Sequence, residues 1–290
     1  MKNKIQIVLI IILGISITFL LLKLRLNKDL VINESFNKMD SYLKINKVFQ
    51  KDFLINYALN INSSRDYERI DYLGEYISDF GYNDLASNID VYIYNTHQTE
   101  SYSYHRINEY NINETVLLAS YMLREKLRLK GINAFVETTN IKEILNQNNW
   151  KYKQSYSASR ILINAFLTNN NPKLIIDLHR DSGSYEKTTI SIDNVNYAKI
   201  LFVVGKKNPG FESNYNIANK LNELIKNKNP LLSRGITLKD GPSVNGIYNQ
   251  DINPNMVLIE IGGEYNTISE VNNTLDILSA VLYDYIKNGS

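Results

Sequence analysis

The sequence predicts an α/β domain built on a mostly parallel sheet with helices on both faces. From about residue 90 onward, short β-branched runs alternate with amphipathic stretches, which is the pattern of strands joined by crossover helices. The strand, helix, strand order repeats along the chain, and a parallel sheet made in this way is covered on both faces. With 290 residues and 44% hydrophobic side chains, the chain can form one substantial domain plus an appendage.

The first segment is an apolar run from Ile5 to Leu22 that contains no charge. As a helix with a rise of about 1.5 Å per residue it would measure roughly 27 Å, which nearly spans a bilayer. A cleaved signal peptide is the competing interpretation, but no small-residue cleavage site follows the run. We therefore predict a transmembrane anchor over residues 5–24, preceded by a tail of residues 1–4. Basic residues flank the run on both sides, so charge does not set its orientation.

The next segment, residues 25–88, is polar and mixed in charge. It contains helix-like stretches but no cluster of residues typical of catalysis. We interpret it as a helical stalk. The alternation of strands and helices begins near Asp90, so the predicted catalytic domain covers residues 89–288.

Within this domain, the runs predicted as strands are Val91–Tyr94, Ala134–Glu137, Leu174–Leu178, Lys199–Val204 and Met256–Ile261. Helices are expected over residues 114–130, 157–167, 213–225 and the C-terminal segment. Gly131 is placed to end the first helix, and Thr267 with Glu270 has the spacing of a capping box at the start of the last. Such sheets bind ligands outside the carboxyl ends of their strands, so residues that do chemistry should follow the apolar runs.

Composition excludes several classes of function. The formal net charge of +2 gives no electrostatic case for a nucleic-acid partner. Cysteine is absent, which excludes disulfides, iron–sulfur clusters, thiolate zinc sites and a cysteine nucleophile. HExxH, GxSxG, Walker A and GxGxxG motifs are also missing. Any site that uses imidazole must draw on the three histidines at positions 97, 105 and 179.

Three groups of polar residues follow or interrupt predicted strands. His97 follows the first strand in VYIYNTHQTESY, with Glu100 three residues later. His179 ends the buried-looking run in LIIDLHRDSG, and Glu260 interrupts the apolar run in MVLIEIGGEYN. Because the carboxyl ends of parallel strands meet at one edge of a sheet, we expect these side chains to lie close together.

Two histidines and a carboxylate are the ligand set of many hydrolytic zinc sites. His97, Glu100 and His179 are therefore the predicted ligands, and Glu260 is the predicted general base, with a pKa that burial would raise. Other interpretations remain open at this point. Each histidine can be a satisfied structural residue, and Glu260 can form an ion pair with Arg180 or Arg160. His105 lies in a polar, tyrosine-rich stretch and is expected to be solvated or to face substrate.

Over roughly residues 90–285 the sequence resembles the stage II sporulation protein P (SpoIIP) family. The resemblance rests on ordered blocks, which are YIYNTHQTESY, WKYKQSYSASR, IIDLHRDS, FVVGKKNPGFESNYNIA, SRGI, NGIYNQDINP and LIEIGG. It implies an amidase-like fold, because that family is similar to zinc-dependent N-acetylmuramoyl-L-alanine amidases. It also implies hydrolysis of the amide that joins sugar to stem peptide in peptidoglycan, together with an endopeptidase activity on peptide crosslinks.

The resemblance assigns roles to particular residues. His97 and His179 match the metal histidines of the family, and Glu260 matches its catalytic glutamate. The third ligand stays open between Glu100 and Glu114, because related amidases take their carboxylate ligand from the start of the following helix. The implied cofactor is zinc.

The resemblance also implies where the protein acts and with what. The domain would lie outside the cytoplasm, held by a single-pass anchor in the cell membrane, and would act during engulfment of the forespore. The lytic transglycosylase SpoIID is the implied partner. The groups expected to hold a stem peptide, which presents carboxylates and amides, are Arg160, Arg180, Asn249 and Gln250. The alternatives are a non-catalytic wall-binding scaffold and a metallopeptidase that acts on another substrate.

Overall fold

A computed structural model describes residues 88–102, 114–242 and 244–288. The predicted tail and anchor, nearly all of the predicted stalk, and His105 lie outside the described residues. Within the described ranges, no helix is long and apolar enough to cross a membrane. The fold can therefore be compared with the sequence from residue 88 onward.

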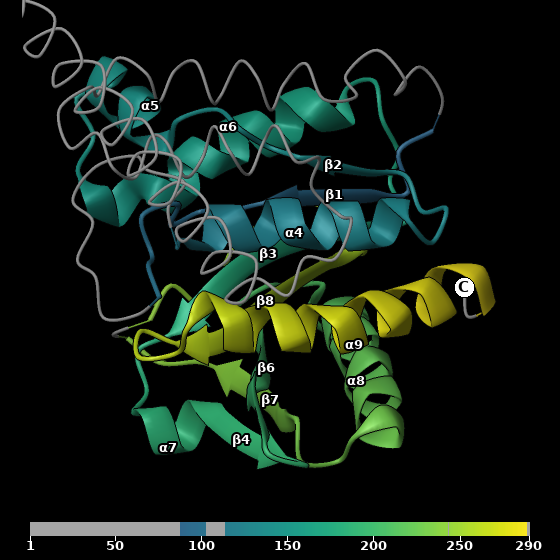
Figure 1. The fold of residues 1–290 in the computed structure, drawn as a ribbon. Coiled ribbons are helices and arrows are strands. Elements are labelled where there is room, and N and C mark those ends of the chain that lie inside the picture. Colours follow the sequence, from purple (N-terminus) through teal and green to yellow (C-terminus); the bar gives the residue numbers. More distant parts are fainter. Residues whose placement is uncertain (1–87, 103–113, 243, 289–290) are drawn as a thin grey trace, which may run out of the picture. The chain divides into compact units, whose positions relative to one another are not determined.

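A six-stranded sheet forms the centre of the fold, with the strand order β2-β1-β3-β8-β6-β7 (Figure 1). Its strands are β1 (Val91–Tyr94), β2 (Ala134–Val136), β3 (Leu174–Asp181), β6 (Ile200–Gly205), β7 (Ser233–Lys239) and β8 (Met256–Gly263). The strands β2, β1, β3 and β8 are parallel to one another. β6 and β7 are parallel to each other, and β6 is antiparallel to β8. The predicted mostly parallel sheet is confirmed, with one antiparallel junction.

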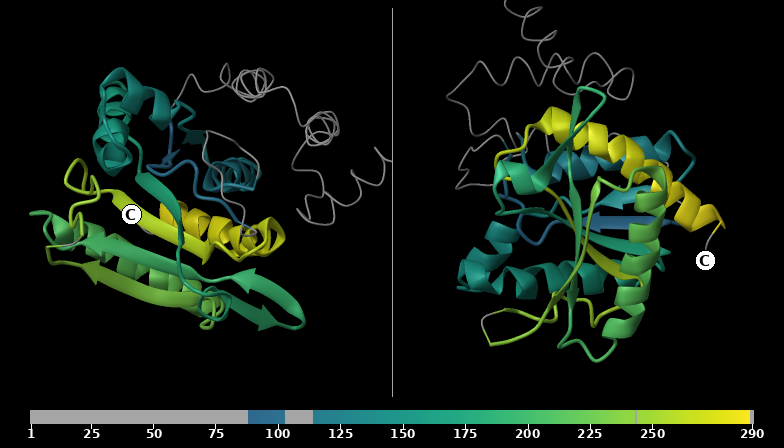
Figure 2. Two further views of the ribbon diagram at one scale, coloured as in Figure 1. Left: turned by 90° about the vertical axis from the view of Figure 1, so that its left-hand side faces the viewer. Right: turned by 90° about the horizontal axis from the view of Figure 1, so that it is seen from below.

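Helices cover both faces of this sheet. They are α4 (Val116–Arg128), α5 (Ile141–Gln147), α6 (Ser155–Leu167), α7 (Tyr185–Thr188), α8 (Phe211–Lys228) and α9 (Ile268–Asn288), with a 3₁₀ turn at Tyr152–Gln154. Because β2 and β3 lie on opposite sides of β1, right-handed crossovers place α4 and α6 on opposite faces. α9 contacts both α4 and α8 and lies between them (Figure 2).

The core consists of the strand residues and the inward faces of these helices. All four residues of β1 are buried, as expected for a parallel strand covered on both faces. On the α6 face, the rings of Tyr92 and Phe166 stack with centroids 3.9 Å apart, beside Ile163 and Ile175. Fully burying one aliphatic or aromatic side chain contributes about 1.5–3 kcal/mol before the loss of conformational entropy. Packing of these apolar faces therefore holds the helices to the sheet.

Both predicted end signals are present. Gly131 has φ 73° and follows the last turn of α4, a conformation that glycine adopts without steric cost. At the start of α9, the Glu270 backbone N–H donates to Thr267 Oγ1 at 3.2 Å. In return, the Thr267 backbone N–H donates to Glu270 Oε2 at 2.8 Å. This reciprocal pair satisfies two N–H groups that the first turn of a helix leaves unpaired.

Several elements differ from the prediction. α6 begins at residue 155 and α8 spans 211–228, both earlier than expected from their apolar residues. The structure also contains β7 and a hairpin of β4 (Thr189–Ile192) and β5 (Val195–Ala198). These strands were missed because they are mostly half-buried, so they lack a continuous apolar run. The turn of the hairpin, at residues 193 and 194, has positive φ at both positions, as type I′ turns do.

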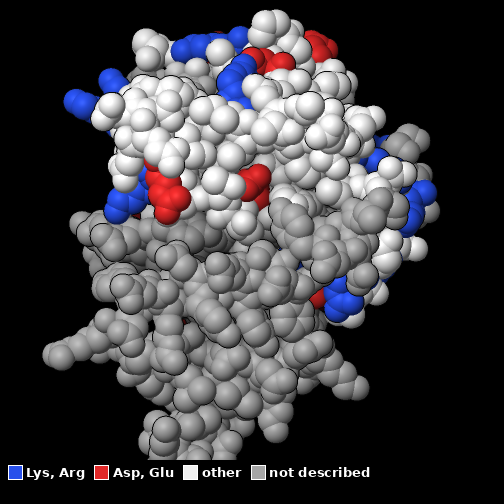
Figure 3. All heavy atoms as spheres, turned by 90° about the horizontal axis from the view of Figure 1, so that it is seen from above, with Lys and Arg blue, Asp and Glu red and all other residues white. Residues whose placement is uncertain are grey.

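Charged side chains are sparse on the described part of the face seen from above (Figure 3). Figure 3 shows its lysines, arginines, aspartates and glutamates in small groups among uncharged residues. With charges of both signs close together, the electrostatic field over the described part of this face is local, because neighbouring opposite charges offset each other.

Candidate active site

The predicted functional residues come from adjacent strands of the sheet. His97 lies in the loop directly after β1, and His179 and Glu260 lie near the carboxyl ends of β3 and β8. His179 and Glu260 are direct partners in the register of β3 and β8, so their side chains project from the same face. A turn closed by the Glu100 N–H and the His97 carbonyl, 3.0 Å apart, keeps Glu100 beside His97. The strand ends bring these groups together, as expected.

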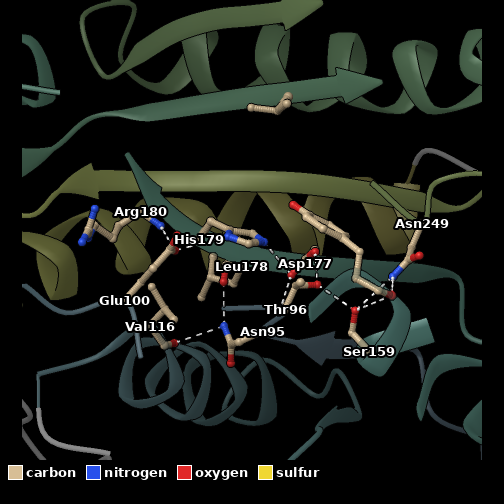
Figure 4. A network of polar contacts seen from close by, with 12 residues as sticks. Asn95, Thr96, Glu100, Val116, Ser159, Asp177, Leu178, His179, Arg180 and Asn249 are labelled. Carbon is tan, nitrogen blue, oxygen red and sulfur yellow. Dashed lines mark hydrogen bonds and ion pairs between the residues drawn. The ribbon is translucent and has the colours of Figure 1, made fainter. Parts of the chain in front are cut away.

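The His179 side chain lies between two carboxylates (Figure 4). Its Nδ1 is 3.2 Å from Glu100 Oε2. Its Nε2 is 2.8 Å from Asp177 Oδ1, although that contact lacks the alignment of a hydrogen bond. The imidazole is buried, with 4% of the residue exposed. Both ring nitrogens are therefore positioned by the protein.

Asp177 is itself fixed by a short chain of polar contacts. Its Oδ1 accepts from the Thr96 backbone N–H at 3.0 Å, and its Oδ2 accepts from the Thr96 hydroxyl at 2.8 Å. The Thr96 and Ser159 hydroxyl oxygens are 2.9 Å apart. The Asn249 amide donates to the Ser159 oxygen at 3.0 Å. This line of side chains joins β3 to the β1 loop, α6 and the segment before β8 (Figure 4).

The electrostatics of this cluster follow from its charges. Burial alone would lower the pKa of His179, but the neighbouring Asp177 and Glu100 carboxylates raise it well above its ordinary value. Burial alone would raise the pKa of Glu100, but His179 and the Arg180 backbone N–H hold it below the usual value. That N–H donates to Glu100 Oε2 at 3.1 Å. The cluster favours an ionised Glu100 beside a positive charge.

His97 has a different environment. Its ring stacks on Tyr152 with centroids 4.9 Å apart and meets the Tyr156 ring edge-on at 5.5 Å. The His179 ring lies 5.4 Å away, nearly perpendicular. Burial, and next the charge of His179, lower the pKa of His97. Its Nδ1 is buried and has no hydrogen-bond partner among the described residues. His97 is thus a neutral imidazole with an unused nitrogen.

Glu260 is the carboxylate with the least favourable surroundings for its charge. Burial, and next the Asp181 carboxylate, raise its pKa to about 7. Arg234 and His179 act in the opposite direction. Arg234 Nη1 forms an ion pair with Asp181 Oδ2 at 2.5 Å. A carboxyl group that titrates near neutrality can both take up and release a proton at physiological pH.

The donor atoms fit a metal ion in kind. Ligands of a tetrahedral zinc ion lie about 3.3 Å from one another, as follows from bond lengths of about 2.0–2.1 Å. The 3.2 Å between His179 Nδ1 and Glu100 Oε2 matches that separation, and the unpartnered nitrogen of His97 is a further donor. Among the described residues, no group of three or more His, Asp or Glu side chains is arranged to hold a metal ion. His97 would have to lie closer to His179 and Glu100 for these three residues to bind one ion.

Of the two candidates for the third ligand, Glu100 is the one whose carboxylate contacts His179. Glu114 lies two residues before α4, with φ 46°. Its carbonyl oxygen accepts from the Tyr102 N–H at 2.7 Å. The Glu114 backbone thus pairs with a residue that follows Glu100. The geometry favours Glu100, and the ligand role of either residue stays a prediction.

The residues predicted to hold a stem peptide mostly have partners within the protein. Arg160 forms a two-contact ion pair with Asp251. Arg180 donates to the carbonyl oxygens of Ser101 and Asp181 at 3.0 and 3.1 Å. The alternative that either arginine pairs with Glu260 is therefore not what the structure contains. The charge of Glu260 is balanced in part by Arg234 instead.

Asn249 and Gln250 are also used internally. The Asn249 amide donates to the Tyr156 carbonyl at 2.9 Å. The Gln250 amide donates to the Val203 carbonyl and accepts from the Gly205 N–H, each at 2.8 Å. Both side chains are buried, so this geometry suits a role in holding the segment before β8. Substrate binding by them stays a prediction that the contacts do not favour.

Three residues near the site were missed by sequence reasoning. Asp177 precedes His179 by two positions, so strand alternation alone places both on one face. Tyr156 has its pKa raised well above the ordinary value by burial and next by Asp177 and Glu100, which keeps its hydroxyl protonated. Arg234 comes from β7, at the edge of the sheet. No local pattern signals the last two, because distant segments bring them to the site.

Comparison with known proteins identifies relatives along most of the chain. The family model described as "Stage II sporulation protein P (SpoIIP)" matches residues 33–283. A protein of Bacillus subtilis (strain 168) named "Stage II sporulation protein P" is 38% identical over 205 residues. That alignment covers 67% of this chain and 51% of the relative. The chain thus spans about half the length of the relative that it matches.

Among solved structures, Cwp6 from Clostridium difficile has a TM-score of 0.43 with 14% identity, over 71% of this chain and 30% of that one. The CwlD amidase from Clostridioides difficile, in complex with the GerS lipoprotein, has a TM-score of 0.41 with 15% identity, over 67% and 94%. A metallo-carboxypeptidase from Burkholderia cenocepacia has a TM-score of 0.41 with 10% identity, over 71% and 59%. Likeness of this degree carries no argument about function.

Proposed function

The chain belongs to the stage II sporulation protein P family, and from that premise we propose that it is a metal-dependent peptidoglycan hydrolase. The proposed reaction is that of a zinc-dependent N-acetylmuramoyl-L-alanine amidase. It hydrolyses the amide between the lactyl group of muramic acid and the first residue of the stem peptide. Hydrolysis of amides in peptide crosslinks is part of the same proposal, because the chemistry of the bond is the same.

The observation that carries the proposal is the meeting of two histidines and two glutamates at the carboxyl ends of adjacent parallel strands. His179 Nδ1 lies 3.2 Å from Glu100 Oε2, and the His97 ring lies 5.4 Å from the His179 ring. Glu260 is the register partner of His179 on the next strand. Two imidazoles, one ionised carboxylate and one carboxyl group with a pKa of about 7 are the groups that metal-assisted amide hydrolysis requires.

His97, Glu100 and His179 would hold the metal ion. When bound, the ion would polarise the substrate carbonyl and lower the pKa of a water molecule. Asp177 Oδ1 lies 2.8 Å from the nitrogen of His179 that does not face Glu100, and its negative charge would orient the ring when the metal is bound. Such carboxylate–histidine contacts set the tautomer and orientation of metal-binding imidazoles.

Glu260 moves the proton in the proposed reaction. Its carboxylate takes a proton from the attacking water as the water oxygen bonds to the carbonyl carbon. It then gives that proton to the amide nitrogen as the carbon–nitrogen bond breaks. The products are the lactyl carboxylic acid and the free amino group of the peptide. A base and acid in one residue works best when its pKa is near the operating pH.

The test uses the full-length chain in detergent and isolated cell wall. Stem peptides should be released in the presence of zinc, and the release should stop when a chelator is added. A His97→Ala/His179→Ala double variant should be inactive, whereas Tyr283→Ala, an exposed ring on α9, should keep wild-type activity. Full activity of the double variant, or after complete chelation, would contradict the metal role.

The pH dependence tests the role of Glu260. The base must be deprotonated to act, so kcat should fall as the pH drops through the pKa of this group. A bound cation lowers that pKa from its metal-free value of about 7. The acid limb of the kcat profile should therefore lie at or below pH 7 and should be missing from the residual activity of Glu260→Gln. An unchanged acid limb in that variant would assign it to another group.

Location and partner are further parts of the proposal. The predicted anchor over residues 5–24 would hold the domain on the outer side of the cell membrane, where peptidoglycan lies. Protease added to intact protoplasts should then degrade the domain. The transglycosylase SpoIID is the proposed partner, and co-purification from membranes tests it. A protease-resistant domain would contradict the outward orientation.

A further inference from the structure

A pocket opens beside His97, on the side away from Glu260. Its volume is about 400 Å³. Its walls come from the loop after β1, the start of α5 and the segment that leads into α6. The residues that line it include Trp150, Tyr152, Ile141, Leu145, Gln98 and Lys142. We propose that this pocket binds one sugar ring of the glycan strand, which rests on the proposed amidase function and adds the orientation of its substrate.

An aromatic surface lies next to His97 in this pocket. Tyr152 is 59% exposed, yet its ring stacks on His97 with centroids 4.9 Å apart and planes inclined by 24°. Trp150, which is half-buried, adds a second ring to the same pocket. The faces of aromatic rings carry partial negative charge. They therefore attract the weakly positive C–H groups on the face of a pyranose ring.

The pocket is held in shape by contacts within the protein. Gln98 holds the wall opposite the aromatic rings, because its amide donates to the Thr139 carbonyl and its oxygen accepts from the Ile141 N–H, at 2.8 and 2.9 Å. Ile141 and Leu145 form an apolar floor, each 6% exposed. Hydroxyl and amide groups surround that floor. An apolar, preformed cavity with a few polar groups is the usual form of a small-ligand site.

The charge of the pocket walls favours a sugar over a peptide. A stem peptide presents several carboxylates, whereas the pocket walls contain one basic residue, Lys142. On the other side of the site, beyond β8, Arg234 is paired with Asp181 and also lies near Glu260. A substrate whose amide lies at His97 and His179 would place its uncharged glycan over β1 and its peptide on the β8 side. The strand order β1-β3-β8 sets this direction.

The experiment uses the fact that Trp150 is the only tryptophan among the 290 residues. Tryptophan fluorescence of the full-length protein therefore reports on this pocket alone. The probes are the disaccharide of N-acetylglucosamine and N-acetylmuramic acid without peptide, and separately the free stem tripeptide. We expect a saturable fluorescence change with the disaccharide and none with the tripeptide at the same concentrations.

Variants show whether stacking is the cause. Tyr152→Ala should weaken disaccharide binding by about fivefold to tenfold, the scale of an aromatic contact. Tyr152→Phe keeps the ring and should bind within about twofold of wild type. Tyr283→Ala removes an exposed ring far from the pocket and serves as the control. Isothermal titration with the same variants verifies that altered fluorescence reflects altered binding.

Two results would overturn the inference. One is a fluorescence change with the tripeptide that Lys142→Gln removes, since the pocket would then hold peptide. The other is the absence of any change with the disaccharide while the protein releases stem peptides from cell wall, which would leave the amidase proposal intact. Disaccharide binding without peptide release would instead contradict the amidase proposal and leave the sugar site standing.

Discussion

The two candidate metal histidines are held in opposite ways. His179 lies between the carboxylates of Asp177 and Glu100, and its pKa is raised well above the ordinary value. His97 lies among the rings of Tyr152 and Tyr156, and burial lowers its pKa. The same residue type is thus fixed by charge on β3 and by aromatic packing after β1. Substitutions should therefore have different consequences at the two positions.

The largest expected difference concerns stability without metal. His179→Ala leaves the buried Asp177 and the half-buried Glu100 without their shared positive partner, so it should lower the free energy of unfolding at pH 7 by about 3–5 kcal/mol. His97→Ala removes packing but leaves no buried charge, and about 1 kcal/mol is the expected cost. Chemical denaturation in the presence of a chelator measures both. Equal losses would mean that the carboxylates do not hold His179 through charge.

The second difference concerns Glu260, whose environment disfavours its charge. Its pKa is about 7 in the folded protein, above the ordinary glutamate value of about 4.3. The folded state holds this proton over a pH range in which the unfolded state has lost it, so stability decreases as the pH rises through that range. Glu260→Gln removes this penalty, and the metal-free variant should be more stable than wild type at pH 8 by up to about 3 kcal/mol.

A measurement at lower pH provides the control for Glu260→Gln. At pH 4.5, Glu260 is protonated in the folded wild type, so Glu260→Gln should leave the free energy of unfolding nearly unchanged there. Thermal and denaturant unfolding at the two pH values measure the contrast. A stability difference that does not depend on pH would show that burial of charge is not the cause. A gain in stability with a loss of activity would mark Glu260 as a functional residue.

The third prediction tests how Asp177 positions His179. Asp177→Asn keeps the size and the contact with the Thr96 N–H but removes the negative charge. Zinc affinity should fall by about 10-fold to 100-fold, the usual effect of losing such a partner. Competition with a chromogenic chelator measures affinity independently of catalysis. Asp276→Asn, at the exposed end of an ion pair with the buried Lys126, is the matched control and should leave zinc affinity unchanged.

The smallest expected effect is at Tyr152. Tyr152→Phe keeps the ring that stacks on His97 and removes only the hydroxyl, which contacts the Thr99 side chain. Zinc affinity should stay within about twofold of wild type, because surface changes usually contribute less than about 0.5 kcal/mol. The chelator competition used for Asp177→Asn measures this too. A larger loss would show that the hydroxyl, and not the ring, positions His97.

Much of the fold could be predicted because its signals are local. The buried strands β1, β3 and β8 each contain a short apolar run, and the capping box at Thr267 and Glu270 is a spacing within one turn. β7 could not be found in this way because its residues are half-buried and include a glycine. Local apolar patterns arise from burial. Strands that are only half-buried therefore have a weaker apolar pattern in the sequence.

The same difference between local and distant signals applies to the site. The positions of His97, His179 and Glu260 near predicted strand ends indicated that they would lie together, because the carboxyl ends of parallel strands meet at one edge of a sheet. The partners of Arg160 could not be predicted, since Asp251 is 91 positions away. Gln250 looked available for substrate in the sequence, but the structure places its amide between two backbone groups of β6. Such pairings depend on which segments pack together, and no periodicity reports them.

The placement of the site on three strands also bears on how the protein folds. Glu100 and His179 meet across 79 positions of the chain, and Glu260 joins only when β8 pairs with β3. Contacts between such distant segments form late, after the loops between them have closed. A chain still emerging from the ribosome before β8 is made would have its candidate metal donors but not the proposed base. The proposed site is complete only after β8 has been synthesised and has paired with β3.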